Sequence, residues 1–423
     1  MTALARAALE DETPGLGSSP WSDARLFSLL AATADRHPHR LAFCDQPNRE
    51  SWSGRPRIAW TYSNTVRIVE RLAAYLTKLE LPEGAPVGIC LPNGSEACVT
   101  ILAAERAGYT PCLLSASWPE ERLGQALEAA NVVAVICQSR LADERPADMF
   151  CQLAARYYGI RFVCAYGPQV PDGVIDLDRA ILDTAADCVL QEGTGHVGLV
   201  TFEIRNGRPH PLFRPYESAV AAAVSCLVPL PVGPGDRILT LLAPDDHRGL
   251  TLGLVASLVS GATLEGHGLV DGAALHLALD SDQRTHLVAP GWAETALAAS
   301  DLPASVASVV LVHEAPVRFK ARGELRRPVT DVLGFGELAL LAHARSEAGH
   351  LLLSLDAAGP PDGGTGDLLR TRRDPEGRIE FGGSASHVYD FIRGAPQIPA
   401  QEPLWRSSGF KADLFAGTVI GVR

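Results

Sequence analysis

Residues 86–114 read PVGICLPNGSEACVTILAAERAGYTPCLL, and this stretch indicates the fold class. It begins with a short apolar run that ends at a Pro-Asn-Gly turn signal, which predicts a buried strand at 86–91. A helix is expected from about Ser95 to Ala107, because Gly108 supplies a stop signal, and a second apolar segment follows at 110–114. A strand, a helix and a strand in this order are typical of a parallel βαβ unit.

The same alternation continues along most of the chain and predicts an α/β fold. Apolar residues at three- and four-residue spacing predict helices at 24–36 and 63–80, with Ser63 as the N-cap of the second. Further elements are expected as helices at 119–130, 216–227, 249–259 and 291–299, and as strands at 131–138, 161–166, 196–203, 237–242, 285–290 and 307–313. After about residue 345, the segments GHLLLSL (349–355) and GRIEF (377–381) predict a small β-rich portion.

Length and charge limit the classes of function. A chain of 423 residues predicts two or three domains or one large multilobed unit. The formal net charge of -12 argues against a nucleic-acid partner, because an acidic surface repels phosphate. The start of the chain lacks the basic and apolar regions of a signal peptide, and the longest apolar runs contain Pro or Gly and are too short for a membrane span. A cytoplasmic protein is therefore expected.

Nine cysteines lie between Cys44 and Cys226, without a CxxC spacing. Most of them have apolar neighbours, as in VGIC and AVIC. Buried free thiols are therefore predicted, rather than disulfides or a metal site.

Three segments of the first part of the chain carry a resemblance to a known family. They are RLAF (40–43), IAWTYSNTVRIVERLAAYL (58–76) and the run 82–114 that contains the βαβ unit. In order and spacing they resemble the adenylate-forming enzymes: acyl-CoA synthetases, amino-acid adenylation domains and fatty acyl-AMP ligases. The acidic segment at 1–23 is expected to be loose. The resemblance implies a large multilobed AMP-binding-enzyme-like N-terminal domain at 24–383 and a remnant of the family's C-terminal lid at 384–423.

Thr365, Gly366 and Asp367 form a TGD motif just before the hairpin sequence DPEGRIEF (374–381). They resemble the family's ribose motif, whose aspartate accepts hydrogen bonds from both ribose hydroxyls of the nucleotide. The resemblance gives this role to Asp367. An acidic turn in a surface hairpin is the alternative.

The sequence GFGE (334–337) resembles the family's adenine loop, Tyr-Gly-x-Thr-Glu, in which Gly334 and Glu337 match. Leu333 and Gly336 replace the aromatic residue and the threonine. The resemblance implies ATP or AMP as cofactor with Mg²⁺, which Glu337 would help to hold because hard cations prefer carboxylate oxygens. A glycine-rich turn before a helix is the alternative.

His247 lies in LLAPDDHRGLTLGL (241–254), which resembles the Pro-x-x-His-x-x-Gly-Leu segment beside the family's acyl pocket. The match requires a one-residue shift, and a solvent-facing loop histidine is the alternative.

The family's phosphate loop is a Ser/Thr/Gly-rich run that ends in Pro-Lys-Gly, and its small residues let backbone N–H groups approach the phosphates. The corresponding stretch here is TFEIRNGRPHPL (201–212), where Gly207 and Pro209 remain and His210 replaces the lysine. The small positions are taken by larger or charged residues, and the carboxylate of Glu203 would repel a triphosphate. A phosphate loop of normal type is therefore not expected.

The C-terminal segment also departs from the family. Ser384 stands in place of the arginine of the Gly-Arg hinge motif, and most of the lid that follows is missing. RSSGFKADLFAGT (406–418) resembles the lid's last motif, in particular that of fatty acyl-AMP ligases. Lys411 is thus the candidate for the lysine that binds carboxylate and phosphate, with Phe410 as an insertion.

Three hypotheses follow from these matches and departures. The first is a degenerate relative with impaired adenylation that binds an acyl or carboxylate ligand, a nucleotide, an acyl carrier protein or an enzyme partner. The second is an active acyl-AMP ligase, which would form acyl-AMP and pyrophosphate and pass the acyl group to CoA or a carrier protein. The third is acyl transfer or hydrolysis in the same pocket, for which no G-x-S-x-G nucleophile motif is present.

Overall fold

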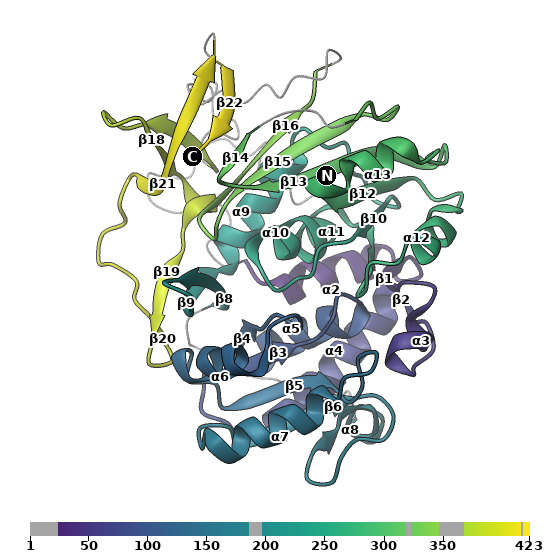
Figure 1. The fold of residues 1–423 in the computed structure, drawn as a ribbon. Helices are drawn as coiled ribbons and strands as arrows, with labels where there is room; N and C mark the ends of the chain where they lie inside the picture. Colours follow the sequence, from purple (N-terminus) through teal and green to yellow (C-terminus); the bar gives the residue numbers. More distant parts are fainter. Residues whose placement is uncertain (1–23, 186–196, 319–322, 347–367, 416–417) are drawn as a thin grey trace.

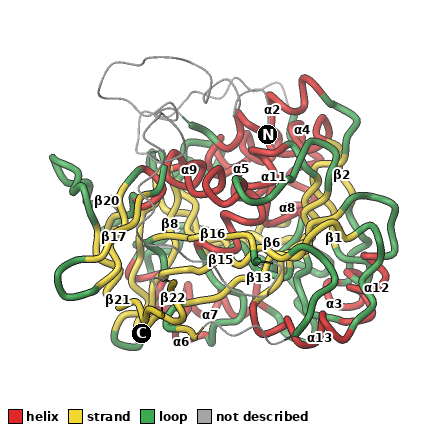
Figure 2. Tube along the Cα trace, turned by 90° about the horizontal axis from the view of Figure 1, so that it is seen from above, coloured by secondary structure: helices red, strands yellow, loops and turns green. Residues whose placement is uncertain are grey.

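The computed structural model describes residues 24–185, 197–318, 323–346, 368–415 and 418–423. Their strands form three sheets, and helices lie between and outside the two larger ones (Figure 1). Seen from above, strands of the larger sheets run across the molecule with helices around them (Figure 2). The predicted α/β class with a small β-rich portion is confirmed.

The first large sheet has nine strands in the order β20-β19-β9-β8-β4-β3-β5-β6-β7. Strands β8, β4, β3, β5, β6 and β7 are parallel to their neighbours in this order. Strands β9, β19 and β20 extend the sheet by antiparallel pairing. The bounds are β3 Pro86–Cys90, β4 Thr110–Leu113, β5 Ala134–Gln138, β6 Phe162–Tyr166, β7 Ile175–Asp176, β8 Gly198–Arg205, β9 Arg208–Pro215, β19 Tyr389–Ile392 and β20 Ala395–Pro396.

The second large sheet has eight strands in the order β16-β15-β13-β12-β10-β11-β1-β2, with only the two edge strands antiparallel. Its bounds are β1 Leu41–Asp45, β2 Ala59–Thr61, β10 Arg237–Thr240, β11 Thr263–Gly266, β12 Thr285–Pro290, β13 Val306–Glu314, β15 Val329–Phe335 and β16 Ala339–Ala344.

A five-stranded antiparallel sheet, β14-β22-β21-β18-β17, forms the β-rich portion. Its strands are β14 Val317–Arg318, β17 Arg370–Arg373, β18 Arg378–Gly382, β21 Arg406–Phe415 and β22 Thr418–Val422. The segment predicted as a lid remnant therefore supplies two strands of this sheet, and β19 pairs with β9 of the nine-stranded sheet. The domain boundary at residue 384 stays a prediction.

Helices connect the parallel strands and form the layer between the two large sheets. The largest apolar cluster joins α2, α4, α5, α9 and α11 to strands of both sheets, whereas α6 and α7 pack on the opposite face of the nine-stranded sheet. The helices are α2 Leu26–Arg36, α3 Arg49–Ser53, α4 Tyr62–Thr77, α5 Ser95–Arg106, α6 Glu120–Ala129, α7 Pro146–Arg156, α8 Leu177–Asp183, α9 Tyr216–Leu227, α10 His247–Leu250, α11 Ala256–Ser260, α12 Gly272–Leu279 and α13 Glu294–Ala299. Among the described helices, none combines the length and apolar character that a membrane crossing requires.

The quoted stretch 86–114 forms β3, α5 and β4, with β3 parallel to β4, so the predicted βαβ unit is confirmed. Two local predictions were wrong. Thr61, not Ser63, caps α4, because its hydroxyl accepts a hydrogen bond from the amide of Asn64 at 3.3 Å. The expected single helix at 249–259 is divided, because a π-helical segment at Thr251–Val255 separates α10 from α11. The expected strand at 349–355 lies outside the described residues.

The cysteine prediction holds for the described residues. Eight of the nine cysteines are described; all eight are free, and all except Cys151 are buried. No cluster of metal-binding side chains occurs in the described ranges. Burial raises the pKa of Cys90 and Cys164 to about 12.

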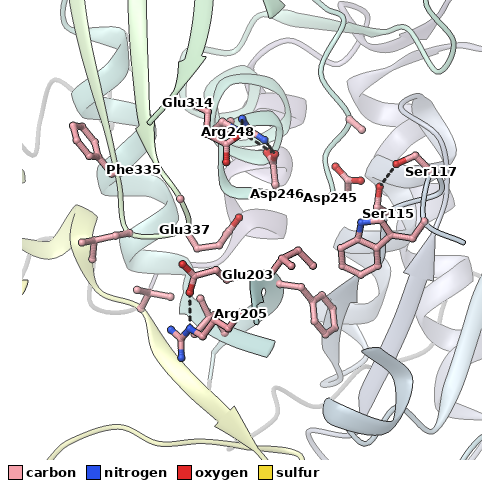
Figure 3. Close-up of a pocket in the computed structure, with 18 of the residues that line it drawn as sticks. Ser115, Ser117, Glu203, Arg205, Asp245, Asp246, Arg248, Glu314, Phe335 and Glu337 are labelled. Carbon is pink, nitrogen blue, oxygen red and sulfur yellow. Dashed lines mark hydrogen bonds and ion pairs between the residues drawn. The ribbon is translucent and has the colours of Figure 1, made fainter. Parts of the chain in front are cut away.

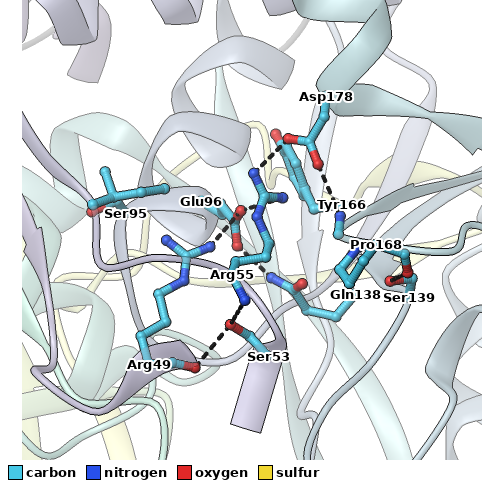
Figure 4. Close-up of polar contacts among 12 residues, drawn as sticks. Arg49, Ser53, Arg55, Ser95, Glu96, Gln138, Ser139, Tyr166, Pro168 and Asp178 are labelled. Atoms are coloured by element: carbon cyan, nitrogen blue, oxygen red, sulfur yellow. Dashed lines mark hydrogen bonds and ion pairs between the residues drawn. The ribbon is translucent and has the colours of Figure 1, made fainter. Parts of the chain in front are cut away.

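A buried ionic cluster connects the two large sheets at the start of α5 (Figure 4). The Glu96 carboxylate pairs with Arg49 at 2.6 Å and with Arg55 at 2.7 Å, and it accepts a hydrogen bond from Gln138 of β5. Arg49 also pairs with Asp45, the last residue of β1. The buried side chains of Gln138, Glu96, Arg49 and Asp45 thus connect the carboxyl end of β5 in one sheet to that of β1 in the other.

We predict that Glu96→Ala lowers the free energy of unfolding by about 3–5 kcal/mol, because two buried guanidinium groups lose their shared counter-charge. The matched control is Asp183→Ala, which removes a pair with Arg179 whose side chains are 71% and 82% exposed. This control should cost less than about 1 kcal/mol. Urea denaturation of both variants checks the prediction, and equal losses would contradict it.

Candidate functional site

A cleft of about 950 Å³ opens where the carboxyl ends of strands from both large sheets face each other (Figure 3). Its walls come from β8, from the turn between β15 and β16, from the start of α10 and from the loops after β3 and β4. Ligands of open α/β folds bind outside the carboxyl ends of the strands, so this cleft is the candidate functional site.

The stretch that the resemblance assigns to the phosphate loop is a regular β-hairpin. Strands β8 and β9 pair from Gly198–Pro215 up to Arg205–Arg208, and Asn206 and Gly207 form the two-residue turn. Both turn residues have positive φ, 52° and 78°, as an Asn-Gly type I′ turn requires. The backbone amides of this hairpin are largely engaged in the ladder, so the stretch does not offer a nest of free N–H groups to a phosphate.

Carboxylates outnumber cations along the cleft. Six acidic side chains and three arginines line it: Glu203, Asp245, Asp246, Glu314, Glu337 and Asp390, with Arg205, Arg248 and Arg406. Each of these arginines already has an acidic partner. Arg205 contacts Glu203 and Asp390, Arg248 contacts Asp246 and Glu314, and Arg406 contacts Glu402.

Glu337 lies at the base of the cleft and is only 7% exposed. One of its carboxylate oxygens accepts a hydrogen bond from the Thr201 hydroxyl at 2.6 Å, and the other accepts one from the amide of His247 at 3.2 Å. Burial, together with the nearby Asp246 carboxylate, raises the pKa of Glu337 to about 7, although Arg214 opposes this shift. Arg214 is fully buried and donates a hydrogen bond to the Glu337 backbone carbonyl.

These contacts test whether the cleft fits Mg²⁺ with a triphosphate. Both oxygens of the Glu337 side chain already accept hydrogen bonds, and the three lining arginines are paired with carboxylates. Each carboxylate oxygen has a second lone pair, so Glu337 keeps the capacity to coordinate a cation, but the arginines of the lining are all paired and do not suit a triphosphate. The TGD residues Thr365, Gly366 and Asp367 lie outside the described residues, so the ribose assignment stays a prediction.

His247 is the first residue of α10 and is completely buried, so the alternative of a solvent-facing histidine is wrong. Its Nδ1 lies 3.0 Å from the Thr251 hydroxyl. Burial lowers its pKa well below the usual range, and Arg214 and Arg248 lower it further. The ring is therefore neutral and is not part of the cleft lining, whereas the backbone amide of His247 donates to Glu337.

His210 and Gly334 have structural surroundings that the sequence did not indicate. His210 contacts Asp390 of β19 at 2.9 Å, which joins the hairpin to the segment after residue 384. Gly334 is buried in β15, and a Cβ there would lie 3.1 Å from Cδ of Arg248. The glycine thus permits close packing of Arg248. The GFGE sequence turns from β15 into the antiparallel strand β16, so the alternative of a turn before a helix is wrong.

Lys411 lies on β21, opposite Arg378, and its side chain is exposed. It does not line the cleft, whereas its neighbour Phe410 does. Phe410 packs against Phe335, with ring centroids 6.2 Å apart. The role of Lys411 stays a prediction.

Sequence reasoning missed strand β9 and the residues that join the hairpin to its surroundings, namely Thr201, Arg214 and Asp390. The Asn-Gly pair between two extended runs was a usable signal for the hairpin. Asp390 had no local signal, because its partners Arg205 and His210 are about 180 residues away in the sequence.

Comparisons with known proteins agree with this architecture. Residues 30–167 match the family model "AMP-binding enzyme". Pyochelin synthase PchD of Pseudomonas aeruginosa is 30% identical over 140 residues, which cover 33% of this chain and 24% of the relative. A salicyl-AMP ligase / salicyl-S-ArCP synthetase of Mycobacterium tuberculosis is 27% identical over 256 residues, which cover 57% of this chain and 42% of the relative. The matched part thus spans about a quarter to two fifths of these relatives.

Solved structures show the same fold over nearly the whole chain. The Klebsiella oxytoca NpsA N-terminal subdomain, in complex with anthranilyl-AMSN, aligns with a TM-score of 0.66 and 16% identity, covering 94% of this chain and 98% of that structure. O-succinylbenzoate coenzyme A synthetase (MenE) of Bacillus subtilis, in complex with ATP and magnesium ion, aligns with a TM-score of 0.68 and 15% identity over 93% of this chain and 98% of that structure. Mycobacterium smegmatis MbtA has a TM-score of 0.71 and 18% identity, with coverage of 95% and 75%.

We predict that Glu337 gives the protein a pH-dependent stability. Its folded pKa of about 7 lies above its ordinary value of 4.5, so the folded state binds the proton more tightly than the unfolded state. This contribution is fully present below about pH 4.5 and is lost as the pH rises to 7, by about 3 kcal/mol at most. Urea denaturation between pH 4 and 8 should show a smaller fall in Glu337→Gln than in the wild type; part of the fall stays in the variant, because burial also raises the pKa of Glu105 to about 7. Parallel pH profiles for the two proteins would contradict the prediction.

Proposed function

Because the chain belongs to the adenylate-forming superfamily, we propose that it retains the superfamily's cleft as a ligand-binding site but has impaired ATP-dependent adenylation. The observation that carries the proposal is the β8–β9 hairpin, which takes the place of a glycine-rich phosphate loop.

The charge of the cleft supports this proposal. Two like charges 4 Å apart repel by about 4 kcal/mol at an effective dielectric constant near 20, so a triphosphate in a cleft with excess carboxylates is strongly disfavoured. Removal of one donor that stabilises a developing charge costs about 2.7–4 kcal/mol of barrier. The hairpin removes several such donors together, and the paired arginines do not replace them.

The same charge distribution favours an uncharged acyl compound over a free carboxylate as the ligand. An acyl group that is already esterified or carried as a thioester lacks the anionic oxygen of a free carboxylate. The Mycobacterium tuberculosis relative is named a salicyl-S-ArCP synthetase, which supports a carrier protein as one class of partner. An enzyme partner is the other class that we propose.

An active AMP-forming ligase is the second candidate. The TGD motif at 365–367, Glu337 and Lys411 favour it, because these residues match the family's nucleotide and carboxylate positions. The Bacillus subtilis neighbour in complex with ATP and magnesium ion has the same fold.

The first experiment separates these two candidates. We expect no ATP-dependent release of pyrophosphate with a panel of aryl and fatty acids, and no rise in melting temperature with about 1 mM ATP·Mg²⁺. A bound ligand at 100 times its Kd stabilises by about 2.7 kcal/mol, so binding would be visible as a shift. Pyrophosphate release above the level without acid would overturn the proposal in favour of the ligase.

A pair of lysine variants tests any turnover that is found. If Lys411 binds the reacting groups, Lys411→Ala should lower pyrophosphate release by at least about 100-fold, because a charge-stabilising donor is lost. Lys78→Ala is the matched control, since Lys78 is an exposed lysine that does not line the cleft. Equal rates for the two variants would return Lys411 to an ordinary surface lysine.

If AMP alone raises the melting temperature, Asp367→Ala should remove most of that rise, because the ribose hydroxyls lose a paired acceptor. The same shift in the variant would exclude Asp367 as the ribose ligand.

A further inference from the structure

Asp245 differs from the other carboxylates that line the cleft. Four of the others pair with arginines of the lining, and Glu337 accepts two hydrogen bonds from within the protein. In the described part of the chain, no arginine, lysine or histidine side chain forms an ion pair with Asp245. Arg248 contributes to the charge around Asp245, but its guanidinium group is committed to two of the four paired carboxylates.

The carboxylate of Asp245 lies next to two serine hydroxyls of the opposite wall. Asp245 is in the loop between β10 and α10, and it faces the loop between β4 and α6 (Figure 3). Ser115 of that loop is beside the carboxylate, and its hydroxyl oxygen is 2.9 Å from that of Ser117. The side-chain amide of Asn93 holds the loop after β10, because it donates to the Leu242 carbonyl oxygen at 2.8 Å. One carboxylate and two hydroxyls therefore form a group of hydrogen-bond acceptors at this side of the cleft.

Trp118 provides an apolar surface next to these acceptors. It directly follows Ser117, lines the cleft and is partly exposed. Its ring packs edge-on against Phe202 of β8, with ring centroids 5.8 Å apart. The face of an indole attracts both apolar groups and cations.

The negative charge of Asp245 is not compensated within the described residues. Burial raises the pKa of Asp245 above its ordinary range, and the neighbouring Asp246 carboxylate raises it further, although Ser115 and Arg248 oppose the shift. The same charge contributes to the raised pKa of Cys90 at the end of β3. A positive group beside the carboxylate would lower the cost of keeping it ionised.

A primary ammonium group matches these acceptors. It has three N–H donors for one carboxylate and two hydroxyls, and it carries the positive charge that Asp245 lacks. A metal ion is a poorer match, because no cluster of metal-binding side chains occurs in the ranges that the structure describes. A carboxylate on the same ligand would be repelled by the other acidic side chains, since the arginines of the lining are already paired.

We propose that the cleft binds a primary amine without a carboxylate group, whose ammonium is held by Asp245, Ser115 and Ser117 and whose apolar body lies against Trp118. The inference rests on the proposed function, because it takes the cleft as a ligand-binding site. It adds a positively charged group to the chemistry that the ligand of this cleft presents.

The test compares three related compounds with the full chain and without nucleotide, by isothermal titration calorimetry up to about 20 mM. 2-Phenylethylamine has the ammonium group, 2-phenylethanol replaces it by a neutral hydroxyl, and phenylalanine adds a carboxylate to the amine. We expect 2-phenylethylamine to bind with a Kd at least about 10-fold lower than either of the others, because hydrogen bonds to charged groups are worth more than neutral ones. Equal affinities of the amine and the alcohol, or tighter binding of phenylalanine, would overturn the proposal.

Asp245→Asn removes the charge and keeps the size of the side chain. It should reduce the preference for the amine over the alcohol to less than about 2-fold. The matched control is Asp183→Asn, because Asp183 has a side chain that is 71% exposed and does not line the cleft. This control should leave the preference unchanged. A preference that persists in Asp245→Asn, or an equal loss in the control, would overturn the role of Asp245.

A second pair of variants decides the proposal if Asp245→Asn does not fold. Ser117 is exposed, so substitutions there leave the core intact. Ser117→Lys brings an ammonium group of the protein within reach of Asp245 and should remove the preference for the amine. Ser117→Met has a side chain of similar length without the charge and should keep most of it. A preference that persists in Ser117→Lys, or an equal loss in Ser117→Met, would overturn the proposal.

Failure of this inference and failure of the proposed function give different results. Pyrophosphate release with carboxylic acids would overturn impaired adenylation, whereas it would leave the amine preference standing, because the titrations contain no ATP. Absence of amine binding without pyrophosphate release would overturn this inference alone.

Discussion

The buried carboxylate of Glu96 is the contact on which the relative placement of the two large sheets depends. It neutralises two arginines from one short stretch, Arg49 of α3 and Arg55 just after it, and through Arg49 it connects to Asp45 at the end of a strand in the other sheet. Charges at such low exposure are costly unless each has a partner, so the cluster persists only in the arrangement that satisfies all of them. The cleft between the sheets and the orientation of Gln138 both follow from this arrangement.

The β8–β9 hairpin determines whether the cleft offers free backbone amides to an anion. A loop whose amides point into a cavity is a ready site for anions, whereas paired strands use the same amides to hold one another. Thr201 and Arg214 of this hairpin contact Glu337 instead, so the base of the cleft is closed by internal hydrogen bonds and ion pairs. The lining of the site is acidic, which suits an uncharged molecule better than a polyanion.

The fold was predictable from the sequence because its signals are local. Strand β3, helix α5 and strand β4 have the expected order, and helix α9 has the expected bounds of 216–227. The site was harder to predict, because its contacts join segments that are distant in the sequence. Glu337 contacts Thr201, 136 positions away, and His210 contacts Asp390, 180 positions away. A motif match placed Glu337 and His247 near the cleft, but their protonation depends on burial, which the motif does not show. No periodicity shows that His247 is enclosed or that Phe410, rather than Lys411, contributes to the cleft wall.

The distribution of cysteines has a consequence for how this molecule can be studied and handled. Seven buried thiols are spread over strands and helices between Cys44 and Cys226, and the thiolate is the form that reacts with alkylating and oxidising reagents. Modification of these sulfurs thus requires local unfolding. The labelling rate at each cysteine therefore reports how often the strand or helix that contains it opens. Conversely, a chain that unfolds in air exposes many thiols at once and can form mismatched crosslinks, which makes a reducing buffer a condition for reversible refolding.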